Sequence, residues 1–163
     1  MSQTAANERR DRVFLVVVDD SPERTVALRY ACLRALKSGG RVALLRVIEP
    51  VEGAEWGAVA DMMKAERREE AERTLSALAA DVNTITGGLP ILLVREGVPR
   101  DELLALLEED PRISILVLAT STDNSGPGPL ITALAGRYSS RMRVPMTIVP
   151  GNMSEAELDR VTN

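Results

Sequence analysis

The fold is decided by a stretch that reads Ile115-Leu-Val-Leu-Ala119, then Thr120-Ser-Thr-Asp-Asn-Ser-Gly-Pro-Gly-Pro129, then Leu130-Ile-Thr-Ala-Leu-Ala-Gly-Arg-Tyr-Ser-Ser140, and finally Val144-Pro-Met-Thr-Ile-Val149. It predicts an apolar strand, a polar glycine–proline loop, a helix and a second apolar strand. In an open parallel sheet, ligands bind beyond the carboxyl ends of the strands, where the strand order reverses. A loop that leads from such a strand into a helix N-terminus is therefore a candidate anion site.

The preceding residues repeat the same alternation of strand and helix. Apolar runs predict strands at 13–18, 41–48, 91–94 and 113–119, and the last strand follows at 144–149. Helices are expected from Pro22 to about Lys37 with Ser21 as N-cap, over about 58–82, from Pro99 to Asp110, and from Pro129 to about Ser140. The alternation predicts an α/β fold in three layers, a doubly wound five-stranded parallel sheet between helices.

A chain of 163 residues is long enough for one domain. We expect a flexible N-terminal arm over 1–12, the α/β domain over 13–150, and a C-terminal tail over 151–163. Ser154 and Glu157 have the spacing of a capping box, which predicts a short helix in the tail. In the first helix, apolar residues at helical spacing predict one buried stripe, formed by Leu28, Ala31, Cys32, Ala35 and Leu36.

Composition excludes several classes of function. The net charge of −4 leaves no electrostatic footprint for nucleic acid or an anionic membrane. The longest apolar runs are strand-sized, the first twelve residues are polar, and the single Cys32 permits no internal disulfide, so we expect a cytoplasmic protein. The absence of histidine excludes Ser-His-Asp and Cys-His catalysis and His-ligated zinc. A general base has to be a carboxylate, Lys or Tyr, and Mg²⁺ on oxygen ligands remains open.

Residues 13–150 resemble the universal stress protein family. Three motifs carry the resemblance: the strand that ends in Val18-Asp19-Asp20-Ser21, the turn Gly97-Val98-Pro99, and the terminal pattern of strand, Gly-rich loop, Gly-containing helix and Val-Pro-x-x-x-Val. The resemblance implies the adenine nucleotide alpha hydrolase-like strand order 3-2-1-4-5. It also implies a stress-response regulatory protein without robust catalysis, commonly a homodimer, and ATP binding in some members.

The ATP-binding members carry Gly-x-x-Gly, nine residues, then Gly-Ser or Gly-Thr. Here Gly126 and Gly136 keep the nine-residue spacing, but Asp123 replaces the first Gly and Arg137 replaces the Ser or Thr. Pro127 and Pro129 each remove a backbone donor from the loop. The expected ligand is therefore ATP with Mg²⁺, another adenine nucleotide or a small anion, contacted by loop hydroxyls and the helix N-terminus rather than by a full glycine nest.

The resemblance places Asp19 near the adenine and ribose and Val47 in the adenine pocket. The remaining candidate binding residues lie in or after the loop: Thr120, Ser121, Ser125, Gly126, Gly128, Gly136 and Arg137. In the alternative interpretation, the loop is a stiff connector and Asp19-Asp20-Ser21 is only a turn and helix cap. Trp56 is interpreted as a hydrophobic anchor or interface residue, with stacking on a base as the alternative.

Two other functions stay open. An ATP pyrophosphatase or adenylating enzyme of the same architecture needs a glycine-containing phosphate loop after the first strand, where this chain has Asp19-Asp20-Ser21-Pro22. A dimerisation module that binds no nucleotide is the second. Strand 144–149 is expected at an edge of the sheet, where pairing with its copy forms a homodimer, although Pro145 limits the regularity of that pairing.

Overall fold

The structure is a computed structural model that describes residues 12–50 and 57–163. The expected N-terminal arm, up to residue 11, and Trp56 lie outside these residues. The elements follow in the order β1 (Val13–Val17), α2 (Arg24–Ser38), β2 (Arg41–Ile48), α3 (Gly57–Thr86), β3 (Ile91–Glu96), α4 (Pro99–Glu109), β4 (Ile113–Ala119), α5 (Pro129–Ala135), the 3₁₀ turn η1 (Ser139–Arg141), β5 (Met146–Val149) and α6 (Glu155–Val161).

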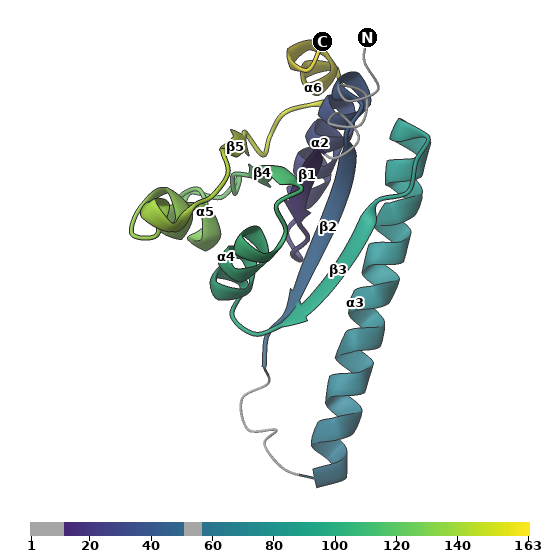
Figure 1. Cartoon of the computed structure of the whole chain (residues 1–163), viewed down its shortest axis with the longest axis vertical. Helices are drawn as coiled ribbons and strands as arrows, with labels where there is room; N and C mark the ends of the chain where they lie inside the picture. Colours follow the sequence, from purple (N-terminus) through teal and green to yellow (C-terminus); the bar gives the residue numbers. More distant parts are fainter. Residues whose placement is uncertain (1–11, 51–56) are drawn as a thin grey trace.

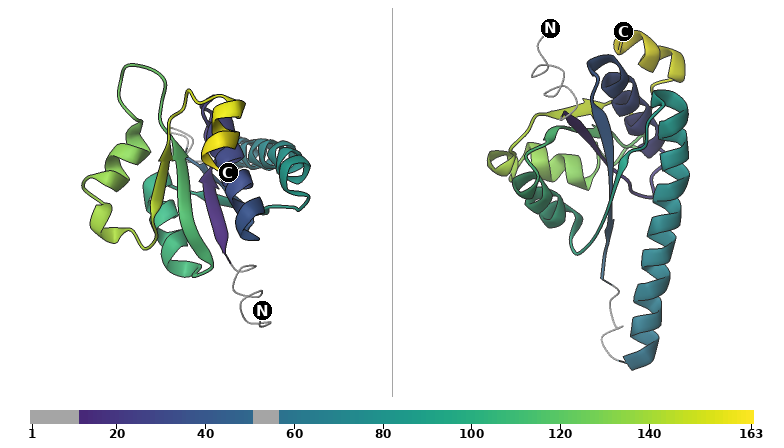
Figure 2. Two further views of the ribbon diagram at one scale, coloured as in Figure 1. Left: turned by 90° about the horizontal axis from the view of Figure 1, so that it is seen from above. Right: turned by 45° about the vertical axis from the view of Figure 1, so that its right-hand side comes forward.

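The five strands form one parallel sheet in the order β3-β2-β1-β4-β5, which confirms the predicted topology. α2 and α3 cover one face, and α4 and α5 cover the other (Figures 1 and 2). The chain runs outward from β1 to β3 and then returns to β4 on the other side of β1. The strand order therefore reverses between β1 and β4, and the loops after these two strands diverge at the carboxyl edge.

Alternate residues of the buried strands supply the two cores. Phe14 and Val16 of β1 face a cluster with α2, α3 and Leu158 of α6, whereas Val13 and Leu15 face a cluster with α4 and α5. These β1 residues are at most 2% exposed, which confirms a strand buried on both faces.

Helix α2 begins later than predicted. Its N-cap is Glu23 rather than Ser21, because the Asp19 carboxylate accepts hydrogen bonds from the amide (3.0 Å) and hydroxyl (2.6 Å) of Ser21 and holds it in a turn. The predicted stripe is buried except at its last member, Leu36, which is 53% exposed. Cys32 is fully buried, and the loss of solvent raises the pKa of its thiol to about 12, so the interpretation of Cys32 as a core residue is confirmed.

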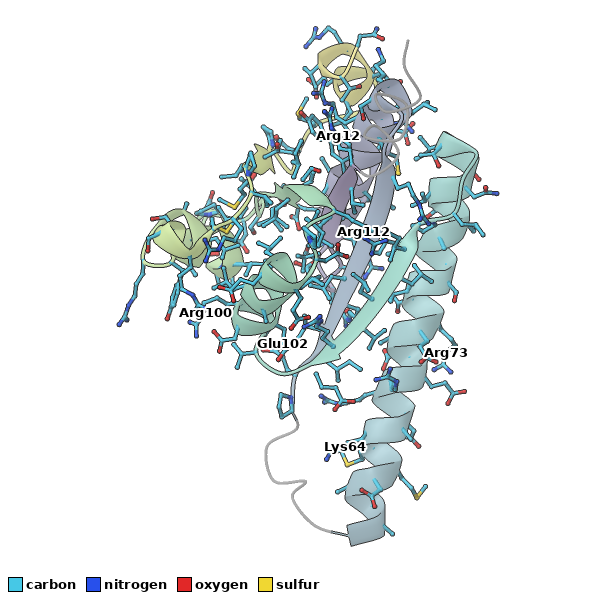
Figure 3. The ribbon with its side chains drawn as sticks, in the orientation of Figure 1. Arg12, Lys64, Arg73, Arg100, Glu102 and Arg112 are labelled. Carbon is cyan, nitrogen blue, oxygen red and sulfur yellow. The ribbon has the colours of Figure 1, made fainter. Side chains whose placement is uncertain are left out.

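Helix α3 is longer than predicted and has 30 residues. It continues to Thr86 because Ile85 extends the apolar stripe of Leu78 and Val82, and it ends at Gly87, whose φ of 76° is a left-handed conformation. Its N-terminal half projects beyond the carboxyl edge of the sheet (Figure 1). Lys64 lies in this projecting half, whereas Arg73 lies farther along the helix (Figure 3).

Two elements after β4 are shorter than predicted. α5 ends at Ala135 instead of Ser140, because Gly136 leaves the helical conformation with φ −103° and ψ −109°. β5 begins at Met146 rather than Val144, after Pro145, whose carbonyl accepts the Leu116 amide at 3.0 Å. α6 has the predicted capping box on Ser154 and packs on α2, where Asp159 pairs with Arg29 at 2.8 Å.

Candidate functional site

Two adjoining hollows lie at the carboxyl edge of the sheet. The larger hollow, of about 540 Å³, lies between the ends of β1 and β2, α3 and the first turns of α4 and α5. The smaller hollow, of about 240 Å³, lies between the start of α2 and the loop after β4. They share Val17, Asp19, Pro129 and Leu130, so we treat them as one crevice. Its position beside the reversal of strand order is the one expected for a ligand site.

The floor of the larger hollow is apolar. Val17 and Val47 come from neighbouring strand ends, both half-buried, and both pack against the core beneath α4 and α5. Ala71 of α3 adds a small, buried wall residue. A flat apolar part of a ligand could therefore pack on these aliphatic side chains. No large side chain of the described residues fills the hollow above them.

Two arginines line the larger hollow. Arg46 donates to the carbonyl oxygen of Val18 (3.0 Å) and to the carboxylate of Asp20 (2.9 Å), which ties the end of β2 to the end of β1. Arg67 of α3 donates to the carbonyl oxygen of Glu49 at 3.0 Å. Both arginines therefore organise the rim. Sequence analysis missed them, although an arginine in an otherwise apolar strand end was a usable signal for Arg46.

The smaller hollow is lined by three carboxylates, those of Asp19, Glu23 and Asp123, and by one guanidinium, that of Arg24. Glu23 is only 7% exposed and accepts hydrogen bonds from the hydroxyl (2.6 Å) and amide (3.1 Å) of Thr122. The Thr122 hydroxyl is the main reason that the pKa of Glu23 lies below its usual value. The pKa of Asp123 is likewise lowered, chiefly by the hydroxyl of Ser125. Both groups are therefore ionised near neutral pH.

Several polar groups of the loop bond within the protein. Ser125 donates its amide (2.8 Å) and its hydroxyl to the Asp123 carboxylate. The hydroxyl oxygen of Thr120 accepts the Gly151 amide at 3.0 Å, and the Ser121 amide donates to the carbonyl of Pro127 at 3.0 Å. Gly126 and Gly128 have φ values of 107° and 114°, so the loop needs glycine there for its own backbone path.

The structure brings some of the predicted binding residues together at the crevice. Asp19 lines both hollows, Val47 lines the larger one, and Ser121, Ser125 and Gly128 line the smaller one. The other predicted residues line neither hollow: Thr120, Gly126, Gly136 and the exposed Arg137. Gly136 and Arg137 follow the end of α5, at the opposite end of that helix from the crevice.

Sequence analysis also missed the part of the site that α3 supplies. Arg67 and Glu70 line the larger hollow, although the densest charged run of α3, Lys64 to Arg73, has the composition of a solvated face. This charged run therefore includes residues that line the hollow and residues of a solvated face, such as Arg73 and Glu69, which pair at 3.4 Å on the exposed side. α3 extends beyond the strand ends (Figure 1), and Arg67, Glu70 and Ala71 of this helix line the larger hollow.

The described residues contain no group of three or more His, Cys, Asp or Glu side chains arranged to hold a metal ion. Within 12–50 and 57–163, no helix has both the length and the apolar character needed to cross a bilayer.

A family model, described as the universal stress protein family, matches residues 12–150. The universal stress protein UspA from Lactobacillus plantarum has a similar structure, with 17% identity, a TM-score of 0.68, and coverage of 86% of this chain and 98% of that one. Two further similar structures are described as complexes. A universal stress protein with cAMP is 21% identical, with a TM-score of 0.54 and coverage of 86% and 98%. A universal stress protein from Archaeoglobus fulgidus with dAMP is 20% identical, with a TM-score of 0.54 and coverage of 85% and 97%. No curated protein sequence matches this chain.

Proposed function

The chain belongs to the universal stress protein family, and we propose that it is a regulatory stress-response protein that binds an adenine nucleotide in the crevice at the carboxyl edge of its sheet. The observation that carries the proposal is the larger hollow, whose volume of about 540 Å³ lies within the range of roughly 300–1,000 Å³ typical of small-molecule sites. Two similar folds are described in complex with cAMP and with dAMP, which makes adenine the first base to test.

The base is best accommodated over the apolar floor of Val17 and Val47, beside the small side chain of Ala71. The sugar then lies near Asp19, whose carboxylate is at the boundary between the two hollows. A carboxylate is a suitable acceptor for ribose hydroxyls. In this arrangement the ligand leaves the larger hollow past Asp19 and points toward the loop after β4.

In this proposal the protein has a regulatory role and no catalytic one. The segment after β1 has no glycine to wrap phosphates, and the chain has no histidine. The alternatives, ATP hydrolysis and adenylation, predict saturable release of phosphate or pyrophosphate, which a coupled assay at high protein concentration measures. Such release would replace the regulatory proposal with an enzymatic one.

Isothermal titration with adenosine, AMP, ADP and ATP, each with and without Mg²⁺, tests binding. Val47→Trp fills the floor of the larger hollow and is expected to weaken binding by about tenfold or more. Val161→Trp is the matched control, because Val161 is half exposed on α6, away from the crevice. The absence of a binding heat with all four compounds, or equal effects of the two variants, contradicts the proposal.

The proposal includes a homodimer formed through β5, the strand predicted to pair with its copy. β5 lies at an edge of the sheet, and Ile148 in it is 42% exposed. An apolar side chain on an edge strand is a candidate for burial against a second copy. Light scattering is expected to give twice the chain mass, and Ile148→Asp is expected to give the monomer mass. A monomer mass for the unmodified protein at every concentration contradicts this part of the proposal.

A further inference from the structure

The charge of the crevice bears on which nucleotide it accepts. Six carboxylates of the described residues line it, from Asp19, Asp20, Glu23, Glu49, Glu70 and Asp123. Three guanidiniums oppose them, those of Arg24, Arg46 and Arg67. Each of the three already donates to a backbone carbonyl, of Asp19, Val18 and Glu49 respectively. The crevice therefore has an excess of negative charge, and its cations are partly engaged.

Part of this excess negative charge lies where the β- and γ-phosphates of a bound ATP would extend. From a sugar near Asp19, the smaller hollow continues to Glu23 and Asp123. The loop groups that usually bind phosphate are partly used here, because the amide and hydroxyl of Ser125 donate to Asp123, and those of Thr122 donate to Glu23. An incoming phosphate thus meets ionised carboxylates together with donors that are already hydrogen bonded.

We infer that the crevice selects adenine ligands of low negative charge, the nucleoside or the nucleoside monophosphate, and discriminates against ATP through the carboxylates of Glu23 and Asp123. The inference rests on the proposed function, since it names the ligand class of that same site. The opposite orientation, with phosphates toward Arg46 and Arg67, also brings them to Asp20, Glu49 and Glu70. Glu23 and Asp123 do not line that larger hollow, so the inference commits to the placement with the phosphates toward the smaller hollow.

Titration calorimetry with adenosine, AMP and ATP, at low salt and with and without Mg²⁺, tests the inference. The expected result is an ATP dissociation constant at least about tenfold higher than that of AMP. In 1 M NaCl, where screening acts over about 3 Å, the ratio is expected to shrink. Binding of ATP as tight as that of AMP, in either metal condition, overturns the inference and leaves the proposed function standing. If none of the three ligands binds, the proposed function fails and the inference fails with it.

Two isosteric variants test whether the carboxylates cause the discrimination. Asp123→Asn and Glu23→Gln keep a carbonyl oxygen that can accept the hydrogen bonds of Ser125 and Thr122, so the loop is expected to retain its path. The double variant is expected to bind ATP about tenfold more tightly than the unmodified protein, with adenosine binding unchanged. Asp61→Asn is the control, because Asp61 is exposed on α3 and outside the crevice. If the double variant discriminates as the unmodified protein does, repulsion by these carboxylates is not the cause.

Discussion

At Gly151, the structure allows the effect of an alanine substitution on the free energy of unfolding to be worked out directly. A Cβ built on Gly151 lies 2.0 Å from the carbonyl oxygen of Thr120 and 2.6 Å from Cγ of Glu23. Real Cβ atoms essentially never lie within 3.0 Å of a heavy atom outside their own residue and its two chain neighbours. In Gly151→Ala, the end of β4 and the segment after β5 therefore have to separate by about 1 Å, and the first obstacle is backbone that cannot rotate away.

Two unfavourable contributions and one favourable contribution determine the change in the free energy of unfolding. Forcing extra volume into a packed site costs about 1–3 kcal/mol. The same movement stretches the hydrogen bond from the Gly151 amide to the Thr120 hydroxyl oxygen, now 3.0 Å, whose net contribution is about 0.5–1.5 kcal/mol. Alanine also reduces the entropy of the unfolded chain, which returns about 0.4–1 kcal/mol. The midpoints of these ranges give an expected decrease in the free energy of unfolding of about 2 kcal/mol for Gly151→Ala.

Urea unfolding followed by circular dichroism measures this cost. With a slope of about 2 kcal/mol per molar urea, the midpoint is expected to fall by about 1 M at an unchanged slope. Gly88→Ala is the matched control, since its Cβ has only the Thr86 hydroxyl oxygen within 4 Å, at 3.9 Å, and it is expected to stay within about 0.5 kcal/mol of the unmodified protein. A Gly151→Ala midpoint equal to that of the control would refute the argument from close packing.

Three further predictions concern the core, the tail and acid stability. Leu104→Ala, at a position of α4 that is 1% exposed, is expected to lower the free energy of unfolding in urea by about 2–5 kcal/mol. Leu92→Ala, at a position 42% exposed on edge strand β3, is expected to lower it much less, and equal losses contradict the assigned core. Ser154→Ala removes the capping box of α6 and is expected to cost about 1 kcal/mol and to speed amide hydrogen exchange in α6, whereas unchanged exchange contradicts a role for the cap. The pKa of Glu23 is lowered from 4.5, so around and below pH 4.5 the unfolded chain binds more protons than the folded protein. The stability that Glu23 contributes is therefore present above that pH and is lost as the pH falls. Between pH 6 and 3, the urea midpoint of Glu23→Gln is expected to fall less steeply than that of the unmodified protein.

The sheet could be predicted from the sequence because its signal is local and repeated. Each strand is an apolar run bounded by turn residues, and the intervening helices require parallel pairing. The strand order additionally needed the family resemblance, since alternation alone does not specify which strands are neighbours. Helix ends were less predictable, because they depend on competition between nearby groups. Serine is a favoured N-cap residue, which made Ser21 the predicted start. The Asp19 carboxylate instead accepts hydrogen bonds from the amide and hydroxyl of Ser21, and α2 begins at Arg24.

The candidate site was predictable at the strand ends and in part of the loop after β4, where Ser121, Ser125 and Gly128 line the smaller hollow. Asp19 and Val47 are at the ends of β1 and β2, and the carboxyl edge of a parallel sheet brings such residues to one crevice. Arg67 was missed because its position depends on how far α3 overhangs that edge. Glu23 was missed because its partner Thr122 is 99 residues away in the sequence, so no local pattern connects them.

The contact between Glu23 and Thr122 changes what the loop after β4 is suited to do. Glycine–serine loops bind phosphate when their amides and hydroxyls lack protein partners. In this chain, Glu23 is the buried acceptor for Thr122, and Asp123 is the acceptor for Ser125. Because both acceptors are anions, they use donors of the loop and also add the charge that repels a phosphate. If the crevice binds an adenine nucleotide as proposed, Asp123 and an acid from the start of α2 would shift the preferred ligand toward lower charge. Neither residue alters the fold or removes the crevice.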